Sequence, residues 1–239
     1  YNVIIEKFTT LTTGHLQIHA PKFREKPSVF RTILNKEELY KVLKEKKSIK
    51  TLAPRVISSA LIHSEKRTLP ISVVGIDPKL EDQLTNLSKR LVKGTYLNNK
   101  HSSHKEKKVL LDERTAKILK LDIDQELILI SGAADGSIAN DRFFIAGIIK
   151  SLEEASTSST VYLPLRDAQE FYALGGRIHE LVLQTDSHKN AHKLANKLSQ
   201  DPQLKDYEIA SWQEIAKEFY RSMIEDKKVA LITGVTGQD

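Results

Sequence analysis

The stretch that decides the fold runs from Val109 to Ile149 and reads VLLDERTAKILKLDIDQELILISGAADGSIANDRFFIAGII. It begins with a short apolar run, passes through a helical turn or two, and then alternates over residues 127–130, which predicts a strand. A loop rich in Gly, Asp, Ser and Asn, residues 131–141, leads to a β-branched and aromatic run at residues 143–149. This composition predicts a strand, a short helix and two further strands joined by an extended hairpin.

The tip of this hairpin is the candidate partner-contact site, because loops held by a regular scaffold commonly carry recognition. Its residues are Asp135, Gly136, Ser137 and Ile138. An apolar Ile138 within a polar tip is suited to docking against a partner. The alternative is that Ile138 folds back on its own hairpin.

Upstream of this stretch, the apolar pattern predicts two helices, three strands and a further helix. We expect a helix over residues 1–11, a strand over 15–23, and a helix that starts at an Asn35–Glu38 capping box and ends near Lys46. Residues 55–63 and 69–76 predict an antiparallel hairpin. Asp77 and Pro78 predict the start of a helix that ends at Gly94 and whose apolar face is formed by Leu80, Leu84, Leu87 and Leu91.

Downstream, helices and strands alternate again. Residues 165–174 predict a short helix, residues 180–185 a strand, Ser187 the cap of a further helix, and residues 207–210 another strand. Ser211 and Glu214 form a second capping box. It predicts one last helix with a single apolar face formed by Trp212, Ile215, Ala216, Phe219 and Met223.

The order of these elements predicts an α+β fold. Residues 15–76 read β-α-β-β and residues 179–211 read β-α-β, with a mainly β block between them. Two such halves that pack their helices on a mixed sheet form a domain of ferredoxin-like (βαβ) character.

Length and composition set the outer bounds. The chain has 239 residues, 40% hydrophobic and 28% charged, which is typical of a globular chain. No apolar run approaches the ~20 residues of a membrane-spanning helix. The first residue, Tyr1, is no initiator Met, so we expect a segment of a longer protein. The lack of Cys excludes thiol catalysis, disulfides and thiolate metal sites.

A net charge of +6 admits anionic partners, either nucleic acid or a lipid surface. The densest basic run, Lys100–Lys108, includes His101 and His104 but no aromatic residue on which a base could stack. We therefore interpret it as a solvated loop or a membrane-surface contact and expect no nucleic-acid partner. A basic nucleic-acid-binding module is the alternative function.

The sequence shows no motif that predicts catalysis, a cofactor or a metal. His188 and His192 have the i, i+4 spacing that can share a metal, but no Glu accompanies them, and we interpret them as a solvated helix face. His15 and His19, four apart on one strand, are expected at the surface. Neither a G-x-S-x-G nucleophile motif nor an ATP-binding loop occurs. We expect a protein that is not an enzyme.

The end of the chain, VALITGVTGQD at residues 229–239, resembles the opening of nucleotide-sugar dehydratases, in which glycines approach a dinucleotide. Phosphate binding at such a motif requires a following helix, and the sequence ends at Asp239. We interpret 229–239 as a tail, and a fragment of a nucleotide-sugar enzyme as a less favoured alternative.

An ordered series of residues across the chain resembles the extracytoplasmic domain of FtsX-like ABC permeases. The series is Gly94, Val109-Leu110-Leu111, Ala116, Leu119, Leu127, Leu129, Phe144–Ile148, Val161–Leu165 and Ala168-Gln169. It is similar to the MacB-like periplasmic core domain, most of all to that of the lipoprotein-releasing permeases LolC and LolE. Where this family has a Gly-Asp turn, the chain has Asp124-Gln125, and Asp tolerates the left-handed conformation.

The resemblance implies an organisation and a function. Residues 1–92 and 177–228 are expected to form a porter-like subdomain with membrane-proximal terminal helices, and residues 93–176 an inserted sabre-like subdomain. The implied protein is the periplasmic domain of an inner-membrane ABC transporter permease. It would couple cytoplasmic ATP hydrolysis to the movement or extraction of envelope cargo. The implied partners are an ABC ATPase subunit reached through transmembrane helices, a second permease subunit, and a lipoprotein or other cargo, with a membrane surface nearby.

Overall fold

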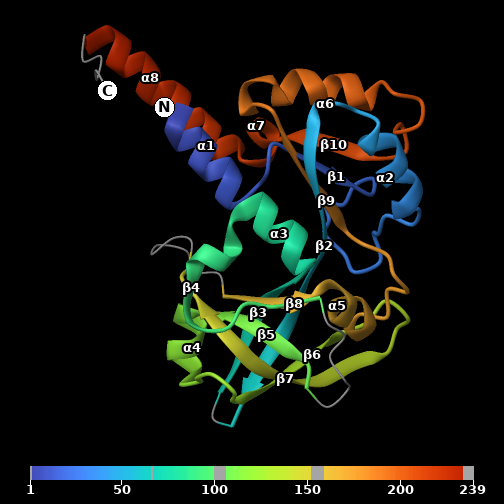
Figure 1. The fold of residues 1–239 in the computed structure, drawn as a ribbon, viewed down its shortest axis with the longest axis vertical. Helices are drawn as coiled ribbons and strands as arrows, with labels where there is room; N and C mark the ends of the chain where they lie inside the picture. Colours follow the sequence, from blue (N-terminus) through green and yellow to red (C-terminus); the bar gives the residue numbers. More distant parts are fainter. Residues whose placement is uncertain (1, 66, 100–105, 152–158, 234–239) are drawn as a thin grey trace.

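The computed structural model describes residues 2–65, 67–99, 106–151 and 159–233, and only the backbone of residues 226–233. Its described strands form one continuous sheet that bends through the length of the molecule (Figure 1). The strands are β1 (Leu16–His19), β2 (Ile49–Ser64), β3 (Arg67–Ile76), β4 (Leu91–Gly94), β5 (Lys108–Asp112), β6 (Glu126–Gly132), β7 (Ile138–Ile149), β8 (Thr160–Pro164), β9 (Glu180–Thr185) and β10 (Glu208–Ser211). The helices are α1 (Asn2–Leu11), α2 (Lys36–Lys44), α3 (Pro78–Thr85), α4 (Glu113–Leu119), α5 (Leu165–Phe171), α6 (Ala191–Ser199), α7 (Trp212–Ile215) and α8 (Lys217–Thr233), with 3₁₀ turns η1 (Leu87–Arg90) and η2 (His188–Asn190).

The part of the sheet next to the chain ends has the order β10-β1-β9-β2 and is antiparallel throughout. Strands β1 and β2 are therefore parallel to each other, with β9 between them and α2 in their connection. Strands β9 and β10 are likewise parallel, with β1 between them and α6 in their connection. These two interlocked split β-α-β units confirm the predicted ferredoxin-like character and the α+β class.

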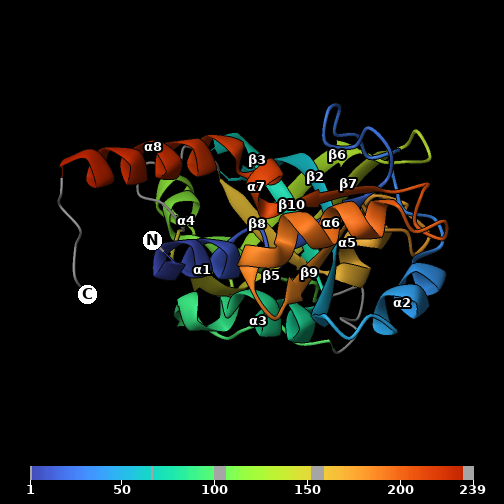
Figure 2. The same ribbon diagram turned by 90° about the horizontal axis from the view of Figure 1, so that it is seen from above.

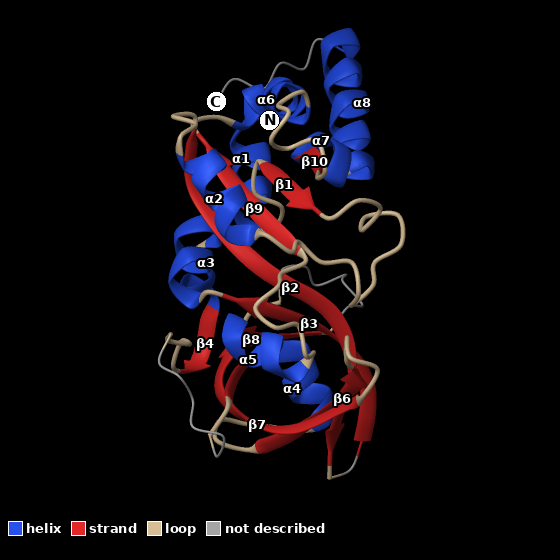
Figure 3. Cartoon of the chain, turned by 90° about the vertical axis from the view of Figure 1, so that its right-hand side faces the viewer, coloured by secondary structure: helices blue, strands red, loops and turns tan. Residues whose placement is uncertain are grey.

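The other part of the sheet closes on itself. Strand β2 pairs with β3, β3 with β8, β8 with β5, β5 with β7, β7 with β6, and β6 with the far end of β2. This sequence of pairings forms a barrel of six strands, seen as the curved strands in the lower half of Figure 3. Closure leaves these strands without a free edge among themselves. The 16-residue strand β2 belongs to both parts and joins them.

Each part has its own apolar core. The barrel core is centred on Phe143, Leu129 and Val161, and it also includes Val56, Ile62 and Val73 from β2 and β3. The second core lies between α2, α6 and one face of the β1–β9 strands. The opposite face of these strands is also covered, because Leu84 of α3 packs on Ala53 and Val182. That residues 93–176 form a separate subdomain stays a prediction, and the barrel also contains β2 and β3.

Two predicted helices are wrong in their second halves. The helix expected from Asp77 to Gly94 ends at Thr85, because Asn86 adopts the left-handed conformation with φ 52°; η1 and β4 follow. Its start is confirmed, since the Asp77 side chain accepts from the backbone N–H groups of Lys79 and Leu80. The last helix is divided at Ala216, whose φ of −103° and ψ of 50° separate α7 from α8. Its apolar residues therefore do not share one buried face.

Several shorter features also differ from the sequence-based expectations. The Asn35 side chain forms no capping hydrogen bond, whereas the capping box of Ser211 and Glu214 is confirmed. Strand β1 ends at His19, since Lys22 adopts a positive φ of 63°. The residues between β6 and β7 are only 133–137, so the hairpin loop is shorter than the predicted 131–141. Asp124 holds its turn with φ 61°, as expected.

Candidate functional site: the hairpin tip and the base of the terminal helices

The predicted contact residues do lie together at the tip of the β6–β7 hairpin. Gly136 has φ 86°, and the Asp135 carboxylate accepts hydrogen bonds from the backbone N–H and the hydroxyl of Ser137 at 3.0 and 2.6 Å. These hydrogen bonds lower the pKa of Asp135. Ile138 is 78% exposed, so the alternative that it folds back on its own hairpin is wrong.

The base of the hairpin is anchored while its tip is free of apolar packing. The Ala134 N–H donates to the carbonyl of Tyr172, a residue of the barrel core, and the Ala133 N–H donates to the carbonyl of Ser137. Ala133 is itself buried in that core. An ordered turn thus presents Ile138 to solvent. A presented side chain of this kind needs little reorganisation to bind a partner.

The terminal helices α1 and α8 extend from the same end of the molecule (Figure 1). They touch where the rings of Phe8 and Phe219 stack with centroids 4.1 Å apart, and Figure 2 shows a gap between the two helices beyond this contact. In Figure 2 the β6–β7 hairpin extends on the opposite side of the molecule from these helices. Val3 and Ile4 of α1 are 79% and 55% exposed, so the apolar residues at the outer end of α1 are uncovered.

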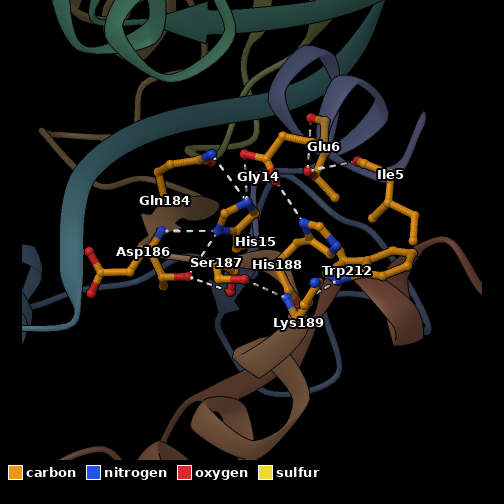
Figure 4. Close-up of polar contacts among 12 residues, drawn as sticks. Ile5, Glu6, Gly14, His15, Gln184, Asp186, Ser187, His188, Lys189 and Trp212 are labelled. Atoms are coloured by element: carbon orange, nitrogen blue, oxygen red, sulfur yellow. Dashed lines mark hydrogen bonds and ion pairs between the residues drawn. The ribbon is translucent and has the colours of Figure 1, made fainter. Parts of the chain in front are cut away.

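Buried histidines at the base of α1 are the part of the site that sequence reasoning missed (Figure 4). His15 and His188 were expected at the surface, but they are 1% and 6% exposed. Their rings approach edge to face at 6.2 Å, and the Glu6 carboxylate of α1 reaches both: 2.6 Å to Nδ1 of His188 and 3.9 Å to Nε2 of His15. Glu6 itself is half-exposed.

The physical reason for this burial is that strand β1 lies between β9 and β10 and has both faces covered. Its polar residues are buried with the apolar ones: Gln17 donates to the Thr13 carbonyl, and His19 bonds Glu180 of β9. Glu6, the partner of His188, is 182 residues away along the chain, so no local sequence pattern predicts this contact. His192, the other half of the i, i+4 pair, is 56% exposed and lies 4.0 Å from Glu214, so the two histidines share no ligand.

A second buried polar network connects β1, β2, β9 and α3. The Arg55 guanidinium donates to both carboxylate oxygens of Glu81, at 2.9 and 2.8 Å, and to Glu180 at 3.0 Å. His19, also buried, lies 2.9 Å from the other oxygen of Glu180. Burial raises the pKa of Glu180, but the contacts with His19 and Arg55 outweigh it and the pKa is lowered. This network fixes the sheet against α3.

Other candidate chemistry finds no support among the described residues. There, no group of three His, Cys, Asp or Glu side chains is arranged to hold a metal. His101 and His104 lie outside the described residues. Lys107, expected in a solvated loop, is 6% exposed and pairs with Asp141. The apolar start of the tail continues α8 as a helix to Thr233, where a dinucleotide fold would need a strand.

These features describe an α+β domain whose two terminal helices leave the same end, with a presented hairpin on the other side. Among the helices that the structure describes, none has the length and apolar character needed to cross a membrane. The chain matches the family described as MacB-like periplasmic core domain over residues 2–201 and belongs to that family. It is therefore a periplasmic core domain of a MacB-like or FtsX-like ABC transporter permease.

Solved structures agree with this assignment in fold. The periplasmic region of MacB from Actinobacillus actinomycetemcomitans has a TM-score of 0.61 and 17% identity, over 91% of this chain and 98% of that chain. The extracellular domain of the noncanonic ABC-type transporter YknZ from Gram-positive bacteria has a TM-score of 0.54 and 13% identity, over 82% of this chain and 99% of that one. No curated protein matches this chain in sequence.

Proposed function

We propose that this domain couples movement of transmembrane helices, driven by a cytoplasmic ATPase, to the movement or extraction of an envelope cargo. The observation that carries the proposal is that α1 and α8 leave the same end of the molecule and touch through Phe8 and Phe219, with the presented hairpin on the opposite side. A displacement of the two helices reaches the sheet through β1, which follows α1 directly, and through β10, which precedes α7. The domain acts by changing position and performs no catalysis.

The cargo we propose is a lipoprotein or another envelope-facing molecule, and the contact surface is the tip formed by Asp135, Gly136, Ser137 and Ile138. The exposed Ile138 supports this, since an apolar anchor in an ordered turn binds with little loss of conformational freedom. The transmembrane helices would continue from α1 and α8. Through them the domain would work with an ATPase and a second permease subunit.

The test uses the intact permease in lipid vesicles with its ATPase. The 239-residue chain has no Cys, so the introduced cysteines are the only thiols in this domain, and native cysteines elsewhere in the permease and its ATPase are replaced first. Spin labels at Lys7 on α1 and at Ser137 at the tip should change their separation between nucleotide-free and ATP-trapped states. A matched pair at Lys93, on β4 beside the barrel strand β7, and Ser137, in the β6–β7 hairpin, should keep its separation. An unchanged Lys7–Ser137 separation would overturn the proposed coupling.

A further inference from the structure

The contacts at the base of the terminal helices form a closed ring that joins α1, η2, α7 and α8. Glu6 of α1 binds His188 of η2, and the His188 carbonyl accepts from the indole N–H of Trp212 at 3.0 Å. Trp212 of α7 meets Tyr220 of α8 edge to face at 5.3 Å. The stacked rings of Phe8 and Phe219 then connect α8 back to α1 at 4.1 Å. The two terminal helices are thus joined both to each other and to the sheet.

His15 lies next to this ring of contacts, and its hydrogen bonds indicate a neutral imidazole. Its Nδ1 accepts the backbone N–H of Thr185 at 3.1 Å, and the hydroxyl of the same Thr185 lies 2.9 Å away. A nitrogen that accepts an N–H carries no proton of its own, so His15 is neutral with its proton on Nε2. The amide nitrogen of Gln184 lies 3.2 Å from Nε2 while the buried amide oxygen has no hydrogen-bond partner, so the amide turned by 180° accepts the Nε2–H; the Glu6 carboxylate lies 3.9 Å from the same nitrogen.

The charged groups around His15 come from each element packed against it. Glu6 of α1 supplies the facing carboxylate, His188 of η2 the second imidazole, and Lys50 of β2 a more distant cation that pairs with Asp186 at 3.0 Å. Burial lowers the pKa of His15; the Glu6 carboxylate opposes this effect, and His188 and Lys50 add to it. The neutral form is therefore the resting form at neutral pH.

We propose that Glu6, His15 and His188 form a proton-responsive joint that sets how α1 is held against the sheet. The proposal deepens the proposed function and rests on it, because it names the residues through which α1 would act on the body of the domain. His15 and His188 are positioning residues: they touch no cargo and act through the helix that Glu6 belongs to.

The effect of a proton follows from the contacts. A second proton on His15 would place an N–H against the Thr185 N–H and break that hydrogen bond. It would also attract the Glu6 carboxylate toward His15. Glu6 is half-exposed and free to change partners. Acidification therefore shifts the Glu6 carboxylate from His188 toward His15 and moves α1 relative to η2 and α7.

The experiment uses this 239-residue chain with spin labels at two exposed positions, Lys7 of α1 and Lys193 of α6. We expect the distance distribution to stay constant above about pH 6.5 and to shift as the pH falls below it, because burial lowers the pKa of His15 below the ordinary value. In His15→Gln the distribution should stay at its neutral-pH form, since Gln can accept the Thr185 N–H but does not titrate. The control His192→Gln, an exposed histidine next to the same region, should keep the full shift.

Two results would overturn the joint: no shift in the parent chain, or an equal shift in His15→Gln. Ring ¹⁵N chemical shifts of the unmodified chain provide a measurement that does not depend on variant folding. They should show His15 Nδ1 unprotonated at neutral pH and protonated in acid; a protonated Nδ1 at neutral pH would refute the assignment. Because no nucleotide or membrane is present, this outcome is separate from the ATP-dependent test of the coupling function.

Discussion

The barrel and the sheet next to the terminal helices are both well buried, but they contain different chemistry. The barrel core consists of apolar side chains around Phe143, to which Tyr172 adds a hydroxyl that donates to the Ser59 carbonyl. The other part buries His15, His19, His179, Arg55 and Glu180. A close-packed apolar core has low compressibility, whereas hydrogen-bonded titratable groups can change partners when a proton is gained or lost. The rigid part carries the hairpin, and the responsive part carries the terminal helices.

The largest effect should come from a cavity in the barrel. Phe143 is fully buried, so Phe143→Ala should lower the free energy of unfolding by about 3 to 5 kcal/mol. Denaturant unfolding followed by circular dichroism measures this. Phe30, 64% exposed, is the matched control, and Phe30→Ala should stay within about 0.5 kcal/mol. Equal losses in the two variants would show that the barrel is not the stabilising core.

The next largest loss of stability is expected in the buried polar network of Arg55, Glu81 and Glu180. Arg55→Met removes the cation between Glu81 and Glu180 and leaves two buried carboxylates without it, which should cost about 3 kcal/mol. Lys93→Met is the control, because Lys93 and its partner Asp122 are both more than half exposed and such pairs contribute at most about 1 kcal/mol. A loss no larger than that of Lys93→Met would mean that the buried network relaxes into water.

The sequence predicted the barrel strands better than the polar contacts near the terminal helices. The β-branched and aromatic alternation of residues 127–130 and 143–149 predicted the β6–β7 hairpin, because barrel strands have one face toward an apolar core. The hairpin pairing of β2 with β3 was confirmed for the same reason. The capping boxes show the limit of local signals: Ser211 caps its helix, and Asn35, with the same spacing to a Glu, does not.

The candidate site near the terminal helices could not be predicted from local patterns. His15 and His19 alternate with Leu16 and Ile18, which reads as one buried and one solvated face. His15 is covered by Glu6 of α1 and by His188, and His19 by the ring of Phe23. The hydrogen-bond partners of the two histidines on β9 lie more than 150 residues away along the chain. The one signal in the sequence was the number of predicted helices. It exceeds the number needed to cover one face of a small sheet, so some helices cover the other face and bury polar residues of its strands.

Acid should lower the stability of the sheet next to the terminal helices before it affects the barrel. His179 is fully buried; its Nδ1 accepts the Ile57 N–H at 3.0 Å and its Nε2–H donates to the Val29 carbonyl at 3.2 Å. Burial lowers the pKa of His179, and the Val29 carbonyl and Glu180 oppose this only in part. The unfolded chain then binds more protons than the folded one, so stability is retained above the ordinary His pKa of about 6.5 and is lost as pH falls below it.

The slope of that loss is about 1.4 kcal/mol per pH unit for each such histidine, down to its pKa in the folded chain. Denaturant unfolding at a series of pH values measures it, and amide hydrogen exchange locates it. Exchange should accelerate in β1 and β9 while β7 stays protected. His192→Gln should leave the slope unchanged, because His192 is exposed. A flat stability profile between about pH 7 and 5 would contradict the neutral, buried state of His179 and His15.

A smaller effect is expected where the terminal helices meet. The sequence placed Phe219 on one apolar helix face with Trp212, but Phe219 is half-buried and stacks on Phe8. Phe219→Ala should therefore cost only about 1 kcal/mol, the usual contribution of an aromatic pair. A double-mutant cycle with Phe8→Ala measures the coupling between the two rings. A coupling energy near zero would mean that α1 and α8 are held by the body of the domain alone.

The smallest effect on stability, and the one that bears most directly on function, concerns the hairpin tip. Ile138→Ser should change the free energy of unfolding by less than about 0.5 kcal/mol, because the side chain is 78% exposed and contributes little apolar burial. Val92→Ser is the matched control, since Val92 is also an exposed aliphatic residue at a strand, 56% exposed, on β4. In the intact permease, cargo release should fall for Ile138→Ser and stay unchanged for Val92→Ser. If both variants release cargo as the parent does, the hairpin tip is not the contact, and the stable, rigid part of the domain would serve only as a lever for a contact made elsewhere.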